Sequence, residues 1–353
     1  MIERFEMNPV IRKEQVKPSQ EGYEVIGAFN AGAVMHNGEV LLLARIAEKP
    51  NGTSARIVPC ITYDSNRKEN VLREFTKGDE GIDTSDLRII KTSSQNYLTS
   101  ISHFRLARSH DGFNFIIDEE STITAGNEYE SFGIEDPRIT KLNDKYYITY
   151  SSASECGIVT GLISTRDFST FEREGIIFPP DNKDVVIFPE KVNNKYYALH
   201  RPSSSYFGKL DLWIAESTNL REWGNHKRIA SIRPGMWDSE RIGAGPVPIL
   251  TEQGWLIIYH GANEKNRYCL GVMLLDKEQP WKVLARSDQP LFSPEVPYEL
   301  DGFFGNVVFS CGAVQIKDRI IVYYGAADEN TACFSMELSD AFTNIEGTYR
   351  HDK

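Results

Sequence analysis

Residues 135–152 read EDPRITKLNDKYYITYSS, and this stretch decides the fold because four others repeat its pattern. Each copy joins a run of small or apolar residues to a second apolar run through a two-residue polar turn. The other copies are NAGAVMHNGEVLLLAR at 30–45, VIFPEKVNNKYYALHR at 186–201, GPVPILTEQGWLIIYHG at 245–261 and SCGAVQIKDRIIVYYGAAD at 310–328. Turn pairs rich in Asn, Asp and Gly tolerate the positive φ of a tight hairpin. The repeat therefore predicts five β-hairpins.

The spacing of the copies indicates how the hairpins are arranged. Successive copies lie 106, 50, 60 and 64 residues apart, measured between the turn residues Asn37, Asn143, Asn193, Gln253 and Lys317. Such spacing is typical of propeller blades, with the first blade enlarged. A further strand-like segment follows each hairpin, for example LWIAESTNLREW at 212–223, and a fourth, outer strand follows most copies. The sequence predicts an all-β fold, a five-bladed β-propeller with a central axial pocket.

The composition favours one domain. A chain of 353 residues with 41% hydrophobic content can bury a large core, and blades in a ring depend on one another. We expect a single catalytic domain over residues 1–353. Residues 1–25 form an N-terminal arm or close the ring, and residues 48–100 are a polar insertion in the first blade. The insertion either covers the pocket or meets a second subunit, in which case the protein is a homodimer.

Charge and cysteine content exclude several classes of function. The net charge of −11 argues against a nucleic-acid or anionic-membrane partner. No apolar stretch is long enough to span a membrane, and the first residues lack the apolar core of a signal peptide, so we expect a cytoplasmic protein. Five scattered cysteines without a CxxC pair or metal-ligand spacing indicate core thiols rather than a metal or redox site. We expect neither metal nor cofactor. The cysteines are Cys60, Cys156, Cys269, Cys311 and Cys333.

Hairpin geometry gathers polar residues at one rim of the ring. In an antiparallel hairpin the start of the first strand lies beside the end of the second, so both ends of all five copies share a rim. Polar and basic side chains are therefore expected around the mouth of the axial pocket, where propellers form their sites. These residues are Asn30, Arg45, Asp136, Arg138, Ser151, Arg201, Arg241, His260, Asn306 and Asp328.

This set suits phosphate chemistry. Arg201, Arg241, His260 and Lys183 place three or four cations around one small anion, and guanidinium groups match phosphate oxygens. Asp136 supplies a carboxylate opposite them. One acid facing a phosphate site is what glycoside phosphorolysis needs, because the acid protonates the leaving sugar while phosphate attacks the anomeric carbon. Hydrolysis needs a second carboxylate to activate water.

Each assignment has a structural alternative. Asp136 stands before a proline at a strand start and could be a turn or cap residue. His260 could be a core histidine with its hydrogen bonds satisfied. Arg201 and Arg241 could instead form structural ion pairs with Glu190, Glu240 or Asp238. A propeller without a convergent acid and cation cluster would be a non-catalytic scaffold.

Several motifs resemble the glycoside hydrolase family 130 mannoside phosphorylases. They are GIEDPRIT at 133–140, DVVIFPEKV at 184–192, YYALHRP at 196–202, ERIGAGPVPILTEQGWLIIYHGA at 240–262 and NVVFSCGAVQIKDRIIVYYGAAD at 306–328. The resemblance runs from about Gly27 to Leu338. It implies a five-bladed propeller that cleaves β-mannosides with inversion, uses inorganic phosphate as co-substrate and releases α-mannose 1-phosphate.

The resemblance also implies roles for individual residues. Asp136, in Glu-Asp-Pro-Arg, is the implied proton donor, acting directly or through a hydroxyl of the bound mannose. The implied phosphate ligands are Lys183, Arg201, Arg241 and His260. Expected sugar contacts are Asn30, Arg45, Arg105, Arg138 and Asp328. The hydrolytic branch of the family carries acidic residues where phosphorylases carry basic ones, so the basic Arg201 and Arg241 favour a phosphorylase over an inverting β-mannosidase.

Two features refine the expected specificity. Residues 93–115, SSQNYLTSISHFRLARSHDGFNF, look like those of members that act on β-1,2-linked mannose. The expected substrates are β-1,2-mannobiose or short β-1,2-mannooligosaccharides, with β-1,4-mannosides as the alternative. Lys183 stands where arginine is frequent in the family, so this contact is a point charge rather than a planar fork.

Overall fold

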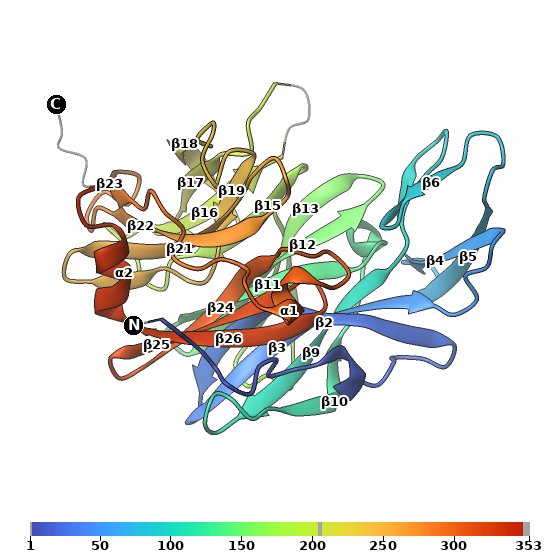
Figure 1. Cartoon of the computed structure of the whole chain (residues 1–353), viewed down its shortest axis with the longest axis horizontal. Helices are drawn as coiled ribbons and strands as arrows, with labels where there is room; N and C mark the ends of the chain where they lie inside the picture. Colours follow the sequence, from blue (N-terminus) through green and yellow to red (C-terminus); the bar gives the residue numbers. More distant parts are fainter. Residues whose placement is uncertain (1, 204–206, 349–353) are drawn as a thin grey trace.

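The computed structural model describes residues 2–203 and 207–348. In this part of the chain nearly all regular structure is β-strand, which confirms the all-β prediction (Figure 1). The helices described are α1 (Pro297–Leu300) and α2 (Leu338–Asn344), with short 3₁₀ turns η1 (Lys13–Gln15) and η2 (Glu128–Glu130). None of the described helices is long and apolar enough to cross a membrane.

Most strands belong to five antiparallel sheets. The first contains, from one edge to the other, β2 (Tyr23–His36), β3 (Glu39–Pro50), β9 (Ile101–Ser109) and β10 (Ile116–Ile123). The second contains β11 (Ile134–Leu142), β12 (Lys145–Ser154), β13 (Gly157–Thr165) and β14 (Glu172–Phe178). The third contains β15 (Asn182–Ile187), β16 (Tyr196–Pro202), β17 (Leu212–Ser217) and β18 (Gly224–Ala230).

The last two sheets depart slightly from this plan. The fourth contains β19 (Arg241–Ala244), β21 (Gly254–Ala262), β22 (Tyr268–Leu275) and β23 (Val283–Arg286), with β20 (Ile249–Thr251) also paired to β21. The fifth contains β24 (Val308–Ile316), β25 (Arg319–Ala326), β26 (Asn330–Glu337) and β1 (Glu3–Arg4). The outer strand of the fifth sheet thus comes from the other end of the chain.

The sheets contact one another in chain order. β2 contacts β11, β11 contacts β15, and β15 contacts β19. β24 contacts β21 and β22 of the fourth sheet and β2 of the first. Each sheet therefore meets the next, and the fifth meets the first.

The hydrophobic core is divided among these contacts. Five clusters of buried residues each lie between two neighbouring sheets. Alternate residues of β3 serve different clusters: Leu41 and Leu43 pack against the second sheet, whereas Val40 and Leu42 pack against the fifth. Side chains alternate between the two faces of a strand, so an inner strand with apolar residues on both faces joins two neighbours. This explains the continuous apolar runs of the repeat.

The predicted turns are where the sequence places them. Asn37, Asn143, Asn193 and Lys317 have φ values of 49°, 56°, 51° and 56°, the left-handed conformation that tight hairpins require. In the fourth copy the turn lies between β20 and β21 at residues 252–253, and Gly254 has φ 140°.

Residues 51–100 fold separately from the strands of the first sheet. They contain a hairpin and a three-stranded sheet, formed by β4 (Ile57–Asp64) with β5 (Glu69–Thr76) and by β6 (Asp83–Asp86), β7 (Ile89–Lys91) and β8 (Asn96–Leu98). Figure 1 shows this segment projecting beside the five sheets.

Arg4 links β1 to α1 and to the segment that precedes it. Its guanidinium donates to both oxygens of the buried Glu299, at 2.9 and 3.0 Å, and to the carbonyl oxygen of Ser293 at 2.7 Å. It also lies over the ring of Phe292. Glu299 is fully buried, so loss of its cation leaves a poorly compensated buried charge.

We expect Arg4→Ala to lower the free energy of unfolding by about 2–3 kcal/mol, because charge-assisted hydrogen bonds to a buried carboxylate are lost. The matched control is Arg319→Ala, which removes the exposed pair between β25 and Glu3 of β1 and should cost less than about 0.5 kcal/mol. Urea unfolding measures both. Equal, small losses would mean that the contact between Arg4 and Glu299 contributes little to stability.

Candidate active site

Three neighbouring sheets place a polar residue at the same point of their first strands. Asn30 in β2, Asp136 in β11 and Asp184 in β15 have φ values of 49°, 54° and 57°. In each case the pairing register with the next strand shifts at this point, as in a β-bulge. Asn and Asp adopt positive φ more readily than other side chains, and a bulge redirects the side chain that it carries. The same local device thus turns three polar groups towards one place.

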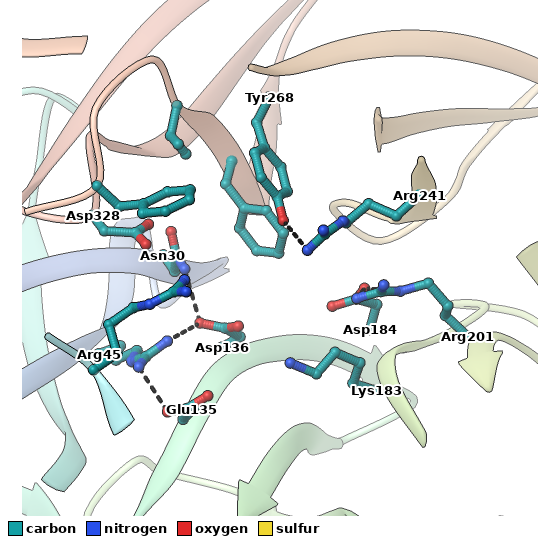
Figure 2. Close-up of a pocket in the computed structure, with 14 residues that line it drawn as sticks. Asn30, Arg45, Glu135, Asp136, Lys183, Asp184, Arg201, Arg241, Tyr268 and Asp328 are labelled. Atoms are coloured by element: carbon teal, nitrogen blue, oxygen red, sulfur yellow. Dashed lines mark hydrogen bonds and ion pairs between the residues drawn. The ribbon is translucent and has the colours of Figure 1, made fainter. Parts of the chain in front are cut away.

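That place is a pocket of about 160 Å³ between the first strands of the sheets (Figure 2). It is lined by five basic side chains, four acidic ones and a polar and apolar remainder. The lining residues are Asn30, Arg45, Arg88, Glu135, Asp136, Lys183, Asp184, Arg201, Arg241, Tyr268, Phe304, Val307, Phe309 and Asp328.

Asp136 lies at the centre of the pocket and is held on one side. Asn30 Nδ2 donates to its Oδ1 at 2.9 Å, and Arg45 Nη1 donates to the same oxygen at 3.1 Å. Arg45 is itself held by Glu135 Oε1 at 2.7 Å and Ser102 Oγ at 3.0 Å. These bonds leave Asp136 Oδ2 without a hydrogen bond to the rest of the described chain. Figure 2 shows this carboxylate between Arg45 on one side and Lys183, Arg201 and Arg241 on the other.

Opposing effects act on the pKa of Asp136. Burial is the largest and raises the pKa, but Arg45, Arg138, the Asn30 hydrogen bond and Lys183 together outweigh it. The net result is a pKa below the ordinary value. With the protein's own charges alone, Asp136 is therefore ionised at neutral pH.

Lys183, Arg201 and Arg241 lie together on the opposite side of Asp136 from Arg45 (Figure 2). Arg201 Nε and Nη2 lie 2.8 and 2.7 Å from Asp184 Oδ2. Arg241 Nη1 donates to the Tyr268 hydroxyl at 2.9 Å. No hydrogen bond joins Lys183 Nζ to another side chain in residues 2–203 or 207–348. The three cations thus keep donors available for an anion.

The structure brings seven of the predicted site residues to this pocket. They are Asn30, Arg45, Asp136, Lys183, Arg201, Arg241 and Asp328. The ion pairs weighed against Arg201 and Arg241 are not formed with the partners considered. Arg201 pairs with Asp184, whereas Asp238 holds Arg233 and Arg286 instead.

Arg138 does not line the pocket, contrary to its predicted sugar contact. It is 1% exposed, and its guanidinium donates to the carbonyl oxygens of Asp136, Ala244 and Gly245 at 3.0, 2.9 and 3.2 Å. A further bond of 3.3 Å reaches Asp184 Oδ1. Arg138 comes after the bulge in β11 and its side chain lies beneath the pocket. There its N–H donors are already bonded to carbonyl and carboxylate oxygens of the protein.

Arg105 lies outside this pocket and lines a second one together with Ser102 and Glu119, so its predicted sugar contact stays a prediction. It lies on β9, the third strand of the first sheet, and its Nη1 donates at 2.7 Å to both Glu119 and the Lys17 carbonyl oxygen. The pocket is lined by first strands, by the ends of second strands, by Tyr268 at the start of the third strand β22, and by connecting segments. Arg105 lies in the middle of a third strand instead.

His260 is close to the predicted phosphate site but does not line it. The residue is fully buried; its Nε2 lies 3.3 Å from Asp184 Oδ2, and its ring centroid lies 4.3 Å from that of Phe309. Burial, the largest influence, lowers the pKa of His260 despite the nearby Asp184. A neutral His260 beneath Asp184 supports the pocket from below rather than adding a cation to it.

Sequence reasoning missed half of the lining. Asp184 could have been predicted from the sequence, because its position in the third hairpin is equivalent to that of Asp136 in the second. The other missed residues are Arg88, Glu135, Tyr268, Phe304, Val307 and Phe309. Several come from connections between hairpins, where the repeat predicts nothing. In residues 2–203 and 207–348 no group of three or more His, Cys, Asp or Glu side chains has the geometry of a metal site.

Comparison with known proteins identifies the family. Residues 87–344 match the model of glycoside hydrolase family 130, described as β-1,4-mannooligosaccharide phosphorylase. The chain is 49% identical over 349 residues to the β-1,2-mannobiose phosphorylase of Listeria innocua, covering 98% of each chain. It is 40% identical over 248 residues to a 1,2-β-oligomannan phosphorylase of Thermoanaerobacter, covering 68% of this chain and 80% of that one. The chain therefore belongs to glycoside hydrolase family 130.

Solved structures agree with this assignment. The Listeria innocua enzyme in complex with β-1,2-mannobiose superposes with a TM-score of 0.95, covering 98% of this chain and 99% of that chain. A structure from work on family members that hydrolyse β-1,2-mannosidic linkages in Candida mannan has 21% identity and a TM-score of 0.74, covering 99% and 96%. At that identity the second likeness concerns the fold alone.

Asp328 lies in the same pocket as Asp136 but in the opposite electrostatic state. Burial is the main cause that raises its pKa to about 7, Arg45 opposes the shift, and Asp136 and Glu135 add to it. Between the ordinary value of 3.8 and about 7, the folded protein holds this proton while the unfolded chain loses it. Stability therefore falls as the pH rises through this window.

We expect Asp328→Asn, which cannot ionise, to gain stability over the wild type, and to gain more at pH 8 than at pH 5. Thermal unfolding at the two pH values measures the difference. Asp318→Asn, in the exposed turn of the same sheet, is the control and should change stability equally at both. If Asp328→Asn shows no pH-dependent gain, Asp328 is not the group that holds a proton in the pocket.

Proposed function

We propose that this protein is an inverting phosphorylase that cleaves β-1,2-linked mannosides with inorganic phosphate and releases α-mannose 1-phosphate. The observation that carries the proposal is the division of the pocket. One carboxylate, Asp136, faces a group of three cations, Lys183, Arg201 and Arg241. We also propose that the five sheets are the blades of a five-bladed propeller. The contacts of each sheet with the next, and of the fifth with the first, support this arrangement.

The chemistry follows from the two sides of the pocket. A phosphate oxygen attacks the anomeric carbon while the bond from that carbon to the glycosidic oxygen breaks on the opposite face, which inverts the configuration. The leaving oxygen takes a proton supplied through Asp136, directly or by way of a mannose hydroxyl. The attacking hydrogen phosphate gives up one proton in the same reaction, so protons balance overall.

Phosphate itself prepares Asp136 for this role. Lys183 is one of the groups that hold the pKa of Asp136 down. A phosphate dianion placed against Lys183, Arg201 and Arg241 compensates their positive charge and adds a negative one near the carboxylate. Both effects raise the pKa of Asp136, so the acid gains its proton when phosphate is bound.

Hydrolysis is the second candidate because the pocket holds other carboxylates. Glu135 is paired with Arg45, and Asp184 is paired with Arg201. Asp328 remains, but in Figure 2 it lies on the side of Asn30 and Arg45, away from the three cations. A water-activating base would have to lie where those cations are. The arrangement therefore favours phosphate over water as the nucleophile.

The β-1,2 linkage is preferred over β-1,4 on sequence similarity. Identity is 49% to the Listeria innocua β-1,2-mannobiose phosphorylase and 38% over 219 residues to the β-1,4-mannooligosaccharide phosphorylase of Ruminococcus albus. A cytoplasmic location and a homodimer stay predictions. All five cysteines are free and four are buried, which supports the expectation of core thiols.

The first test is phosphate dependence. Purified protein should cleave β-1,2-mannobiose only when inorganic phosphate is present, with one mannose 1-phosphate formed for each mannose. ³¹P NMR of the product detects the α-anomer directly. β-1,4-Mannobiose serves as the linkage control and should be cleaved more slowly. Equal rates without phosphate, with free mannose as the sole product, would replace the phosphorylase by the hydrolase.

The second test is Asp136→Asn. Asparagine tolerates the φ of 54° at this position, so the variant should fold, and it should lose about 10²–10⁴-fold in kcat because an amide cannot supply the proton. Asp144→Asn, in the exposed turn of the same hairpin, is the control and should retain full activity. A folded Asp136→Asn protein with near-normal turnover would move the acid elsewhere, with Asp328 the next candidate.

A further inference from the structure

Asp184 is a second buried aspartate of the pocket that the chemistry above does not use. It is 1% exposed and occupies in β15 the bulge position that Asp136 occupies in β11. Burial raises its pKa, but the guanidinium groups of Arg201 and Arg138 outweigh burial and hold the pKa well below the ordinary value. A fixed negative charge thus lies directly beside the cations assigned to phosphate.

The contacts of Asp184 are unequal. Arg201 Nε and Nη2 approach its Oδ2 at 2.8 and 2.7 Å. Arg138 Nη2 and His260 Nε2 are each 3.3 Å away from a carboxylate oxygen. Hydrogen bonds weaken with distance, so Arg201 is the principal partner.

This contact decides how Arg201 faces the pocket. A guanidinium has two edges that match an oxyanion, and Asp184 occupies the edge formed by Nε and Nη2. Nη1 has no hydrogen bond to another residue in the described part of the chain. Without Asp184, repulsion from Lys183 and Arg241 would favour other rotamers of the long Arg201 side chain. With it, Arg201 is held with Nη1 available to a ligand.

A carboxylate at this place has two opposite effects on phosphate. Its charge repels a bound anion, whereas its hydrogen bonds orient a cation that attracts one. Removing the charge alone would strengthen phosphate binding, and removing the orientation would weaken it. Whether phosphate affinity rises or falls when Asp184 is replaced therefore distinguishes the two roles.

We propose that Asp184 is a positioning residue for phosphate, which holds the Nε and Nη2 edge of Arg201 so that Nη1 faces the anion. The inference rests on the proposed function and adds a residue that orients a phosphate ligand without touching phosphate. Asp184 then helps to position the nucleophile, phosphate, whereas Asp136 supplies the proton to the leaving group. The two residues occupy equivalent positions of neighbouring sheets.

Asp184→Asn tests the proposal, since asparagine keeps the size and the positive φ but removes the charge-assisted contact. We expect the KM for phosphate to rise about tenfold or more, with the KM for β-1,2-mannobiose and kcat at saturating phosphate changed by less than about threefold. An unchanged or lower KM for phosphate would show that charge, not positioning, is what Asp184 contributes, and would overturn the proposal.

A double-mutant cycle with Arg201→Ala shows whether Asp184 acts through Arg201. In the Arg201→Ala background only the repulsion between Asp184 and phosphate remains, so Asp184→Asn should leave the KM for phosphate unchanged or lower it. A second tenfold loss in that background would mean that Asp184 acts through another residue, and the proposal would fail. If Asp184→Asn does not fold, Arg201→Lys takes its place: it keeps the charge but cannot present two edges, and should also raise the KM for phosphate about tenfold. A wild-type KM in Arg201→Lys would contradict the proposal.

Glu130→Gln is the matched control. Glu130 is equally buried and binds Arg173 and the Tyr150 hydroxyl, but Arg173 lies on the outer strand β14. This variant should lose stability while the KM for phosphate stays unchanged. An equal rise in that KM would make the Asp184 effect a general consequence of a weakened core.

A measurement without turnover separates this inference from the proposed function. Inorganic phosphate alone should raise the thermal unfolding midpoint of the wild type and of Glu130→Gln, and raise that of Asp184→Asn much less. If the wild type cleaves mannobiose without phosphate, the proposed function fails on that result alone. Equal midpoint shifts in wild type and Asp184→Asn would overturn the role of Asp184 whatever the reaction proves to be.

Discussion

The burial of one cation, Arg138, is the constraint on which the arrangement of the site depends. A guanidinium withdrawn from water is costly unless its donors are satisfied. Arg138 satisfies them with the Asp136 carbonyl of its own sheet, the Asp184 carboxylate of the third sheet and two carbonyl groups of the fourth. Three sheets must therefore keep fixed positions around this side chain. Asp136 and the side of the pocket that carries Lys183 and Arg201 are held relative to each other by the same group.

The pKa of each carboxylate in the pocket is set by the groups that it contacts. Asp136 is buried and Asp328 is partly buried, yet the pKa of Asp136 is lowered and that of Asp328 is raised to about 7. Asn30 and Arg45 donate directly to Asp136, whereas burial dominates at Asp328. Two carboxylates of one pocket thus have pKa values shifted in opposite directions, and the difference comes from hydrogen-bond donors. Lys183 is among the groups that lower the pKa of Asp136, so an anion bound beside Lys183 would raise that pKa.

The sequence predicted the hairpins well because their signals are local. An Asn-Gly or Asn-Asp pair between apolar runs specifies a turn with positive φ, and Asn37 and Asn143 adopt it. The predicted all-β fold is confirmed, and Asp136, Lys183, Arg201 and Arg241 do line one pocket. Arg138 lies beneath the pocket rather than at its mouth, because the direction of a side chain at a bulge cannot be read from a repeat. Asp184 was missed although it lies in the bulge position of its copy.

The amino-acid sequence by itself determined the repeated β-hairpins, their turns and the end of each hairpin at which polar residues collect. These features depend on residues close together in the chain and on the two-residue period of a strand. Tertiary structure alone decided which polar residues enter the pocket, which lie beneath it and which carboxylates keep a proton. These outcomes depend on burial and on charges that other sheets contribute, as Asp184 of the third sheet does for Arg138 of the second. Electrostatic energies in a low-dielectric interior are set by distances of a few ångströms between residues remote in sequence, and a linear pattern does not contain those distances.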